Sequence, residues 1–330
     1  MSAPLDDISA PSRAATSIAE LPPQRARDPR SAAQQRALYF NTGNAFDLHW
    51  PPVPDASFVD EPARALDTAT PTGLIVCDRS REMGCAFAAT TPLVLVRYAR
   101  IRSGETLSAR FEASGVVIYV ISGRGRSTSP GTRETETIHW RAGDVFVLPG
   151  AVEQSHTAAA DEDAVLWIVS NEPQLAFERL RGPALGDAPT DPVHFTGDEI
   201  EHQIDLLYQV GRGQDIAGSA LIFSSTRQEA IRNVLPTLTV AMNSLPPGLT
   251  QRPHRHNSVA VSLVIQGDRC HSVVDGRRKD WSPWATTVTP ATSVHSHHNG
   301  GDKRAMFLIV QDGGLYYHTR ALGFSFEDGS

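Results

Sequence analysis

The sequence predicts an all-β protein built from two copies of one unit. Short runs rich in β-branched and aromatic residues, separated by Gly, Ser and Pro turns, are typical of a sandwich or a small barrel. Such runs lie at residues 93–98, 116–121, 145–148 and 165–169. The same pattern returns after residue 236, whereas the helical signal is thin. We therefore expect two β-lobes in tandem.

The second run of strands repeats landmarks of the first. The matched pairs are Gly104 with Gly248, Gly123 with Gly267, Trp140 with Trp281, and Pro149 with Pro290. The offset between the copies is 144 residues and drifts to 141. Self-similarity of this kind indicates a duplicated unit.

A chain of 330 residues, 40% of them hydrophobic, is long enough for two cores. We expect a flexible N-terminal tail at 1–35, an extended arm at 36–90, a first lobe at 91–175, a connection at 176–235 and a second lobe at 236–322. Within the connection, residues 174–180 and 229–233 are candidate helices. Each lobe should therefore hold its own β-core.

Composition argues against several classes of function. The balance of 30 basic and 37 acidic residues, with no sustained Lys or Arg run, does not favour nucleic acid as a partner. Three cysteines without CxxC spacing indicate neither a disulfide framework nor a zinc ribbon. Neither a secretory signal nor an apolar run near 18 residues is found. We expect a cytoplasmic protein that does not bind membranes.

Histidines cluster in the second copy, where six of the twelve fall within 45 residues. His254 and His256 stand at i and i+2, so on a strand both imidazoles project to one face, and His295 from a later strand would complete a triad. Neutral imidazoles suit iron, zinc, copper or nickel. Chance clustering is the alternative, and His271 and His298 are expected to be surface or packing residues.

Alternation along the strand predicts a small-residue face beside this triad. The face holds His254, His256, Ser258, Ala260 and Ser262, and the opposite face holds Val259, Val261, Leu263 and Ile265. Small side chains next to a metal would leave room for a planar ligand, with Ser258 and Ser262 as substrate contacts. Tight packing in a barrel is the alternative explanation.

Three further polar residues are candidates for the same site. His297 shares a face with His295 if the segment is extended, so its imidazole would either act on bound oxygen or orient a ligand. Arg252 would grip a substrate carboxylate, although Pro253 disturbs the alternation and a solvated arginine is the alternative. Gln311 ends a strand near a pocket mouth, where substrate contact competes with a core or interface role.

The first copy carries different residues at the ligand positions. Arg110 stands in place of His254, Glu112 in place of His256 and Gln154 in place of His295, while His156 matches His297. We expect a degenerate, metal-free first lobe. Binding of a polar ligand there is the alternative.

Two spaced motifs resemble a known family. Gly-x5-His-x-His from Gly248 to His256 and Pro-x4-His-x3-Asn from Pro290 to Asn299 look like the two motifs of cupins. In duplicate, over about 90–320, they resemble the bicupin ring-cleaving dioxygenases of gentisate, salicylate and 1-hydroxy-2-naphthoate. The resemblance implies an all-β bicupin: two tandem double-stranded β-helix (jelly-roll) barrels with short connecting helices.

The resemblance also implies a chemistry. The ligands of a non-haem Fe(2+) would be His254, His256 and His295, with His297 as the catalytic residue. The substrates would be O2 and a hydroxybenzoate, salicylate-like or gentisate-like, whose ring is opened by extradiol-type cleavage. Family analogy also implies a homodimer or homotetramer.

Two departures from the family pattern affect this expectation. The carboxylate that many cupins place after the second histidine is absent, since Ala260 and Val261 stand there, and this suits the ring-cleaving branch. An arginine that holds the substrate carboxylate in relatives is replaced by Ser262. Two other functions stay open: a cupin lyase, isomerase or hydrolase that uses the metal as a Lewis acid, and a non-enzymatic bicupin that binds a small ligand.

Overall fold

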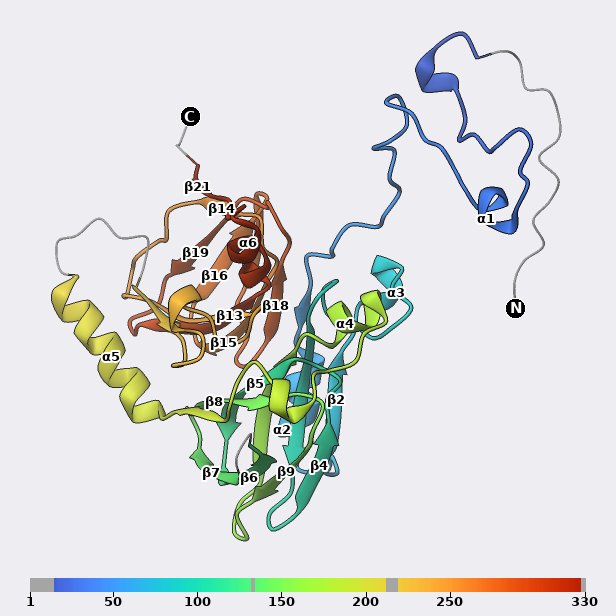
Figure 1. The fold of residues 1–330 in the computed structure, drawn as a ribbon. Helices are drawn as coiled ribbons and strands as arrows, with labels where there is room; N and C mark the ends of the chain where they lie inside the picture. Colours follow the sequence, from blue (N-terminus) through green and yellow to red (C-terminus); the bar gives the residue numbers. More distant parts are fainter. Residues whose placement is uncertain (1–14, 132–133, 212–218, 328–330) are drawn as a thin grey trace. The chain divides into compact units, whose positions relative to one another are not determined.

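The computed structural model describes residues 15–131, 134–211 and 219–327 (Figure 1). The chain divides into two compact units between Pro51 and Pro52. The described part of the first unit contains η1 (Ile18–Glu20), α1 (Ala32–Gln35) and a β-bridge between Gln24 and Tyr39. The tail expected over 1–35 lies in this unit, and its first fourteen residues fall outside the described ranges.

The second unit contains a first lobe of two antiparallel sheets, whose orders are β11-β8-β5-β10-β3-β2 and β4-β9-β6-β7. The large sheet is formed by β2 (Gly73–Cys77), β3 (Leu95–Ile101), β5 (Gly115–Ser122), β8 (Val145–Pro149), β10 (Ala164–Ser170) and β11 (Val193–Phe195). The small sheet is formed by β4 (Thr106–Arg110), β6 (Arg124–Pro130), β7 (Thr135–Arg141) and β9 (Glu153–Ala158).

A second lobe follows, with sheet orders β1-β18-β15-β20-β13-β12 and β17-β16-β19-β14-β21. Its large sheet is formed by β1 (Ser57–Phe58), β12 (Ser219–Phe223), β13 (Thr239–Leu245), β15 (Ala260–Gln266), β18 (Thr286–Thr289) and β20 (Ala305–Gln311). Its small sheet is formed by β14 (His254–His256), β16 (Cys270–Val274), β17 (Arg277–Asp280), β19 (His295–Asn299) and β21 (Phe324–Phe326).

The topology confirms the predicted duplication. Strands β8, β5, β10 and β3 lie in the same order as β18, β15, β20 and β13, and the small sheets repeat β4-β9-β6-β7 as β14-β19-β16-β17. The paired turn glycines Gly104 and Gly248 even share φ of +71°, a left-handed conformation that favours glycine. The two lobes are therefore copies of one sandwich of two sheets.

Strand β5 shows why its run of apolar residues is unbroken. Alternate side chains point to opposite faces of a strand. Val116, Ile118 and Val120 pack inside the first lobe, whereas Val117 and Tyr119 enter a second apolar cluster that also contains residues of the second lobe. A strand buried on both faces has no polar alternation.

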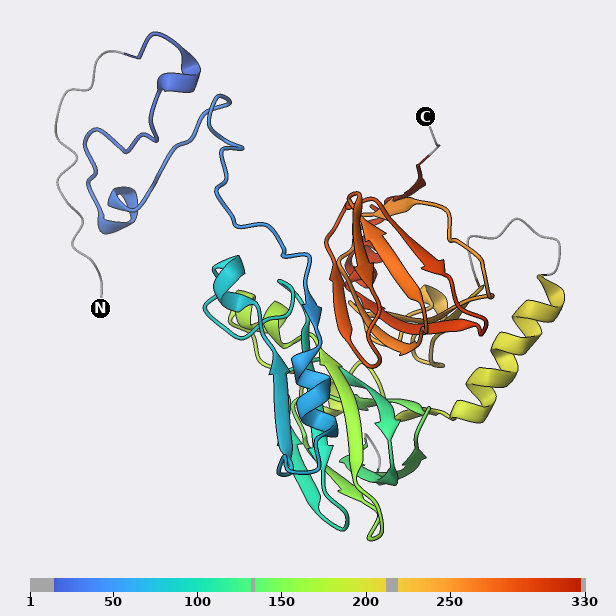
Figure 2. The same cartoon turned by 180° about the vertical axis from the view of Figure 1, so that it is seen from behind.

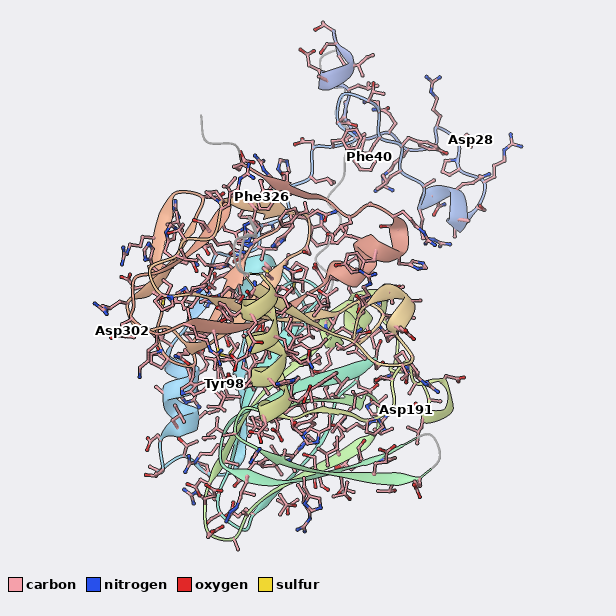
Figure 3. The ribbon with its side chains drawn as sticks, turned by 90° about the vertical axis from the view of Figure 1, so that its left-hand side faces the viewer. Asp28, Phe40, Tyr98, Asp191, Asp302 and Phe326 are labelled. Atoms are coloured by element: carbon pink, nitrogen blue, oxygen red, sulfur yellow. The ribbon has the colours of Figure 1, made fainter. Side chains whose placement is uncertain are left out.

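The large sheets of the two lobes share this second cluster. The Tyr98 hydroxyl, on β3, donates to the backbone oxygen of Trp284 and bonds to Thr286 Oγ1 (2.7 Å), and Trp167 Nε1 donates to the same threonine oxygen (2.8 Å). Tyr98 is labelled at this boundary in Figure 3. The lobes are thus joined through an apolar core that hydrogen bonds cross.

The described helices lie outside the sheets. They are α2 (Asp60–Leu66), α3 (Ser80–Met83), α4 (Glu172–Glu178), η2 (Leu185–Asp187), α5 (Gly197–Val210), η3 (Glu229–Ile231) and α6 (Gly313–Thr319). Helix α2 contacts β2 and β3 (Figure 2). The helix expected at 174–180 corresponds to α4. The one expected at 229–233 was wrong, because only the 3-10 turn η3 forms there.

Edge strands lie beyond the lobe limits expected from sequence. From the arm expected at 36–90, β1 joins the second lobe and β2 joins the first, while β12 forms inside the expected connection and β21 follows residue 322. Short edge strands pair on one side only, so they carry little periodic signal. None of the described helices is long and apolar enough to span a membrane.

Candidate metal centre

Three histidines of the second lobe converge from two adjacent strands of the small sheet. His254 of β14 pairs directly with His295 of β19, and His256 is two residues further along β14. One ring nitrogen from each lies within 4.8 Å of the others. The predicted triad is therefore assembled in space, from strands separated by 38 intervening residues.

Hydrogen bonds fix which nitrogen of each ring faces the centre. Every Nδ1 bonds to a backbone carbonyl: His254 to Arg252 (2.9 Å), His256 to Ser258 (2.8 Å) and His295 to Ser293 (2.9 Å). A carbonyl oxygen only accepts, so we assign the proton to Nδ1 and an unprotonated lone pair to each Nε2. Three such lone pairs form a donor set that fits a first-row transition metal.

The electrostatics favour the same protonation state. Burial lowers the pKa of His254 and of His256 below the ordinary value. For His295, burial and then the neighbouring His254 lower the pKa to about 3. The imidazoles are therefore neutral at neutral pH, which is the form that binds a metal.

A cavity of about 320 Å³ lies beside the triad. Ser262, Ala260 and Thr289 line it, at positions where the first lobe has Ile118, Val116 and Leu148. The equivalence follows from register, because Ala260 pairs with Thr289 as Val116 pairs with Leu148. Large apolar residues fill the first lobe, and their small counterparts leave the second hollow. The volume is sufficient for an aromatic ring.

A larger hollow of about 550 Å³ lies on the first lobe. Its residues include Arg124, about half exposed, which pairs with Asp161 (2.5 Å), and Arg141, which pairs with Asp198. Exposed ion pairs of this kind contribute little free energy and are common on protein surfaces. The cavity beside the triad is the better candidate, because it combines apolar walls with converging lone pairs.

Gln311 stands at the edge of the triad. Its Nε2 lies 3.2 Å from Nε2 of His256, so the amide donates to the lone pair that a metal would take. Gln311 comes from the end of β20, next to β15 in the large sheet. A metal bound here would thus have this side chain as a close neighbour.

His297 is held by a short chain of hydrogen bonds. Trp281 Nε1 donates to Ser272 Oγ (2.8 Å), which lies 2.8 Å from Nδ1 of His297. Because the serine already accepts from the indole, we assign its own hydrogen to His297 Nδ1, which places the imidazole proton on Nε2. Burial lowers the pKa of His297 well below its ordinary value. His297 is thus a neutral hydrogen-bond donor.

Comparisons with known proteins agree with this architecture. No protein-family model matches the chain. The chain is 30% identical over 97 residues to 5-nitrosalicylic acid 1,2-dioxygenase of Bradyrhizobium sp., and 34% identical over 80 residues to 1-hydroxy-2-naphthoate 1,2-dioxygenase of Nocardioides sp. (strain KP7). These matches cover 29% and 24% of this chain. They span only 46% and 21% of the two relatives.

The similarity to solved structures covers most of the chain. Salicylate 1,2-dioxygenase of Pseudaminobacter salicylatoxidans superposes with a TM-score of 0.70 at 12% identity, over 86% of this chain and 91% of that one. Together with the duplicated sheets, this likeness decides the fold. The chain has a bicupin fold. An oxalate decarboxylase of Lactobacillus farciminis also matches, with a TM-score of 0.52 at 16% identity over 79% of this chain and 86% of that one.

Most of the site residues predicted for this bicupin surround the cavity. Ser258, Ser262, His297 and Gln311 all line it. Arg252 does not, because its guanidinium lies over the ring of Phe326, 4.5 Å from the centroid. The expectation that Arg252 faces the cavity was therefore wrong. Pro253 breaks the alternation, so Gln251 enters the cavity wall instead.

Sequence reasoning missed one side of the bicupin cavity. The missed lining residues include Asn243, Gln251, Thr289, Leu322 and Phe324. Phe324 belongs to β21, which pairs with β14, and Phe326 of the same strand is labelled in Figure 3. The internal repeat held a usable signal for one of them, since Thr289 aligns with Leu148.

The first lobe of the bicupin uses the equivalent positions differently. Arg110 and Glu112 form an exposed ion pair (3.0 Å), which lowers the pKa of the glutamate. Gln154 is buried and donates to the backbone oxygen of Pro149 (2.7 Å). His156 retains the Ser–Trp chain of His297, through Ser127 and Trp140, and burial lowers its pKa to about 4.

Proposed function

We propose that this protein is an iron-dependent dioxygenase that opens the aromatic ring of a salicylate-like or gentisate-like hydroxybenzoate. The observation that carries the proposal is the convergence of three neutral imidazoles, without a carboxylate among them, beside a cavity of about 320 Å³. The resemblance to 1,2-dioxygenases of substituted salicylates supports the substrate class.

His254, His256 and His295 would hold the metal. Ferrous iron held by these three neutral ligands would keep its double positive charge and would supply the redox chemistry that ring opening with dioxygen needs. A site saturated by protein donors would leave no place for the substrate.

Residues of the cavity wall would position the substrate and exclude water. Ser262, Ala260 and Thr289 leave space for a planar ring beside the imidazoles. His297 directs an Nε2 hydrogen into the same cavity and would donate to a substrate oxygen. Phe324 of β21 adds an apolar ring to the wall and would limit the access of bulk water to the reacting groups.

Oxygen uptake tests the proposal. The purified chain is loaded with ferrous iron under anaerobic conditions and mixed with a panel of hydroxybenzoates in an oxygen electrode. We expect one dioxygen consumed per ring opened, with loss of the aromatic absorbance. Absence of oxygen consumption with every ring, in protein shown to hold iron, would contradict the proposal.

A Lewis-acid function is the second candidate, favoured by the fold that this chain shares with an oxalate decarboxylase. Such an enzyme would turn over without dioxygen. The panel is therefore repeated under strict anaerobiosis, where the dioxygenase must be silent and a lyase or decarboxylase must remain active.

A further inference from the structure

The first lobe has a cavity of its own, of about 410 Å³, at the place that corresponds to the metal cavity of the second lobe. Strand β10 pairs with β3 as β20 pairs with β13, and α4 follows β10 as α6 follows β20 (Figure 1). Equivalent lining residues are therefore Leu95 and Thr239, Arg97 and Ala241, Glu112 and His256, Glu172 and Gly313, Ala176 and Tyr317, and Arg181 and Leu322.

This first-lobe cavity has a different chemistry from its counterpart. Among the described residues, none that lines the metal cavity is Asp, Glu, Lys or Arg. The lining of the first-lobe cavity includes Arg97, Glu112, Glu172, Arg179 and Arg181. Charged side chains thus replace an imidazole and several small or apolar residues at equivalent positions.

Both glutamates of the first-lobe cavity already have arginine partners. Glu172 pairs with Arg97, and its carboxylate also accepts a hydrogen bond from Ser170 Oγ (2.7 Å). Glu112 pairs with Arg110 (3.0 Å). The charge of each carboxylate is therefore balanced by one guanidinium group.

Arg179 and Arg181 have no such balance. Within the described ranges, no carboxylate forms an ion pair with either guanidinium group. The pKa of Glu112 is lowered first by its hydrogen bond with Arg110, and the charge of Arg181 adds a smaller effect. Two positive charges in the lining of this cavity are therefore without a paired counter-ion.

The remaining wall of the first-lobe cavity is apolar. It includes Phe87, Leu95, Pro173 and Leu180, of which Leu95 and Pro173 are buried. An inorganic anion bound at the arginines would leave this surface in contact with water. A hydrocarbon chain would cover it and gain free energy from its burial.

We propose that the first-lobe cavity binds a small organic dicarboxylate. Arg179 and Arg181 hold its carboxylates, and its hydrocarbon chain lies on the apolar wall. The planar guanidinium group matches the two oxygens of a carboxylate. A ligand with two negative charges balances both unpaired arginines, whereas a monocarboxylate balances one. This site lies in the lobe without the histidine triad, so it is an auxiliary site that is separate from the proposed reaction.

Calorimetric titration of the metal-free full chain tests this inference, because no metal ion then competes for carboxylates. The ligands are adipate, hexanoate, which has the same carbon chain with one carboxylate, and inorganic phosphate. We expect adipate to bind roughly tenfold more tightly than either of the others, the usual effect of one charge-assisted interaction. Added salt should weaken adipate binding, because Arg179 and Arg181 are exposed.

A matched pair of variants locates the site. Arg179 and Arg320 are equivalent residues that end α4 and α6 in the same left-handed conformation, with φ of +57° and +58°. Arg179→Gln should weaken adipate binding roughly tenfold, and so should Arg181→Gln. Arg320→Gln should leave it unchanged, because Arg320 lines neither cavity.

Ser262→Ile provides a second control, because it fills the metal cavity and should leave adipate binding unchanged. Four results would overturn the inference: no measurable binding of adipate, binding of phosphate or hexanoate as tight as that of adipate, an equal loss in Arg179→Gln and Arg320→Gln, or a loss of adipate binding in Ser262→Ile. The ligand series in the wild type decides the matter if a variant fails to fold.

The two proposals fail independently. Adipate binding is measured without metal, so its absence leaves the dioxygenase proposal intact. Absence of oxygen uptake in the iron-loaded protein likewise leaves the dicarboxylate site intact.

Discussion

Ser262 in the second lobe occupies the position that Ile118 holds in the first. Ser262 pairs with Thr287 of β18 and with Ile309 of β20. Ile118 pairs with Phe146 of β8 and with Ile168 of β10, which are the equivalent strands of the first lobe. The substitution of a small for a large residue at one repeat position thus contributes directly to the cavity.

Restoring the first lobe's residue should fill the cavity. Ser262→Ile is expected to weaken aromatic ligand binding roughly 10- to 100-fold, because overpacking costs about 1–3 kcal/mol. Metal occupancy should not change, since the three imidazoles lie on other strands. Binding is measured calorimetrically on the zinc-loaded protein, and unchanged affinity would show that the ring binds elsewhere.

The reciprocal change should affect stability alone. Ile118 is fully buried in the core of the first lobe, so Ile118→Ser should lower the free energy of unfolding by about 2–5 kcal/mol. Urea unfolding measures this loss. A change of similar size in ligand affinity, in protein that remains folded, would contradict the assignment of function to the second lobe.

Removal of one imidazole should empty the metal site. His256→Ala is expected to reduce bound metal from one ion per chain to near zero, measured by atomic emission after dialysis. His271→Ala is the matched control, because that ring stacks on His298, with centroids 4.4 Å apart, outside the triad. Equal metal loss in both variants would mean that the ion binds to the outer pair.

The hydrogen-bond chain behind His297 should matter for turnover. Ser272→Ala removes the group that holds Nδ1, and we expect kcat to fall roughly 10- to 100-fold, as is usual for partners that orient active-site histidines. Ser127→Ala removes the equivalent contact from His156 in the first lobe. That control should keep its kcat, and a similar fall there would indicate a purely structural effect.

Asp312 should make stability depend on pH. Burial raises the pKa of this carboxyl to about 7, although the Val259 N–H donates to it (2.9 Å). Between the ordinary pKa of 3.8 and about 7, the folded chain holds a proton that the unfolded chain has lost, so stability falls as pH rises through this window.

Asp312→Asn replaces the titrating carboxyl with an amide that stays neutral at every pH. The variant should exceed the wild type by roughly 1–3 kcal/mol at pH 8 and differ little at pH 4. Urea unfolding of metal-free protein at the two pH values gives the comparison. A difference that is the same at both pH values would show that Asp312 ionises normally in the folded chain.

The sequence was sufficient to predict those features whose signal is local and periodic. The His254–His256 pair and the alternation through Ser262 placed the triad and the small-residue face correctly, because a strand repeats every two residues. The internal repeat likewise predicted two lobes with equivalent strands. These features depend on neighbours along the chain, which a sequence displays directly.

The remainder of the site depends on contacts between distant segments. Gln251 lines the cavity where Arg252 was expected, because Pro253 interrupts the alternation of side chains along the strand. The periodicity of the sequence does not indicate such an interruption. Phe324 reached the cavity through β21, a strand of three residues. Helix α5 was also missed, although Ile200 and Ile204 are buried at a helical spacing.

The coordination of iron in the reconstituted protein tests the central claim most directly. X-ray absorption at the iron edge should show three imidazole nitrogens and about two or three oxygen ligands near 2.1 Å, with the oxygens partly replaced when a salicylate is added. Four or more protein ligands, or a spectrum that the aromatic ligand leaves unchanged, would contradict an open three-histidine centre.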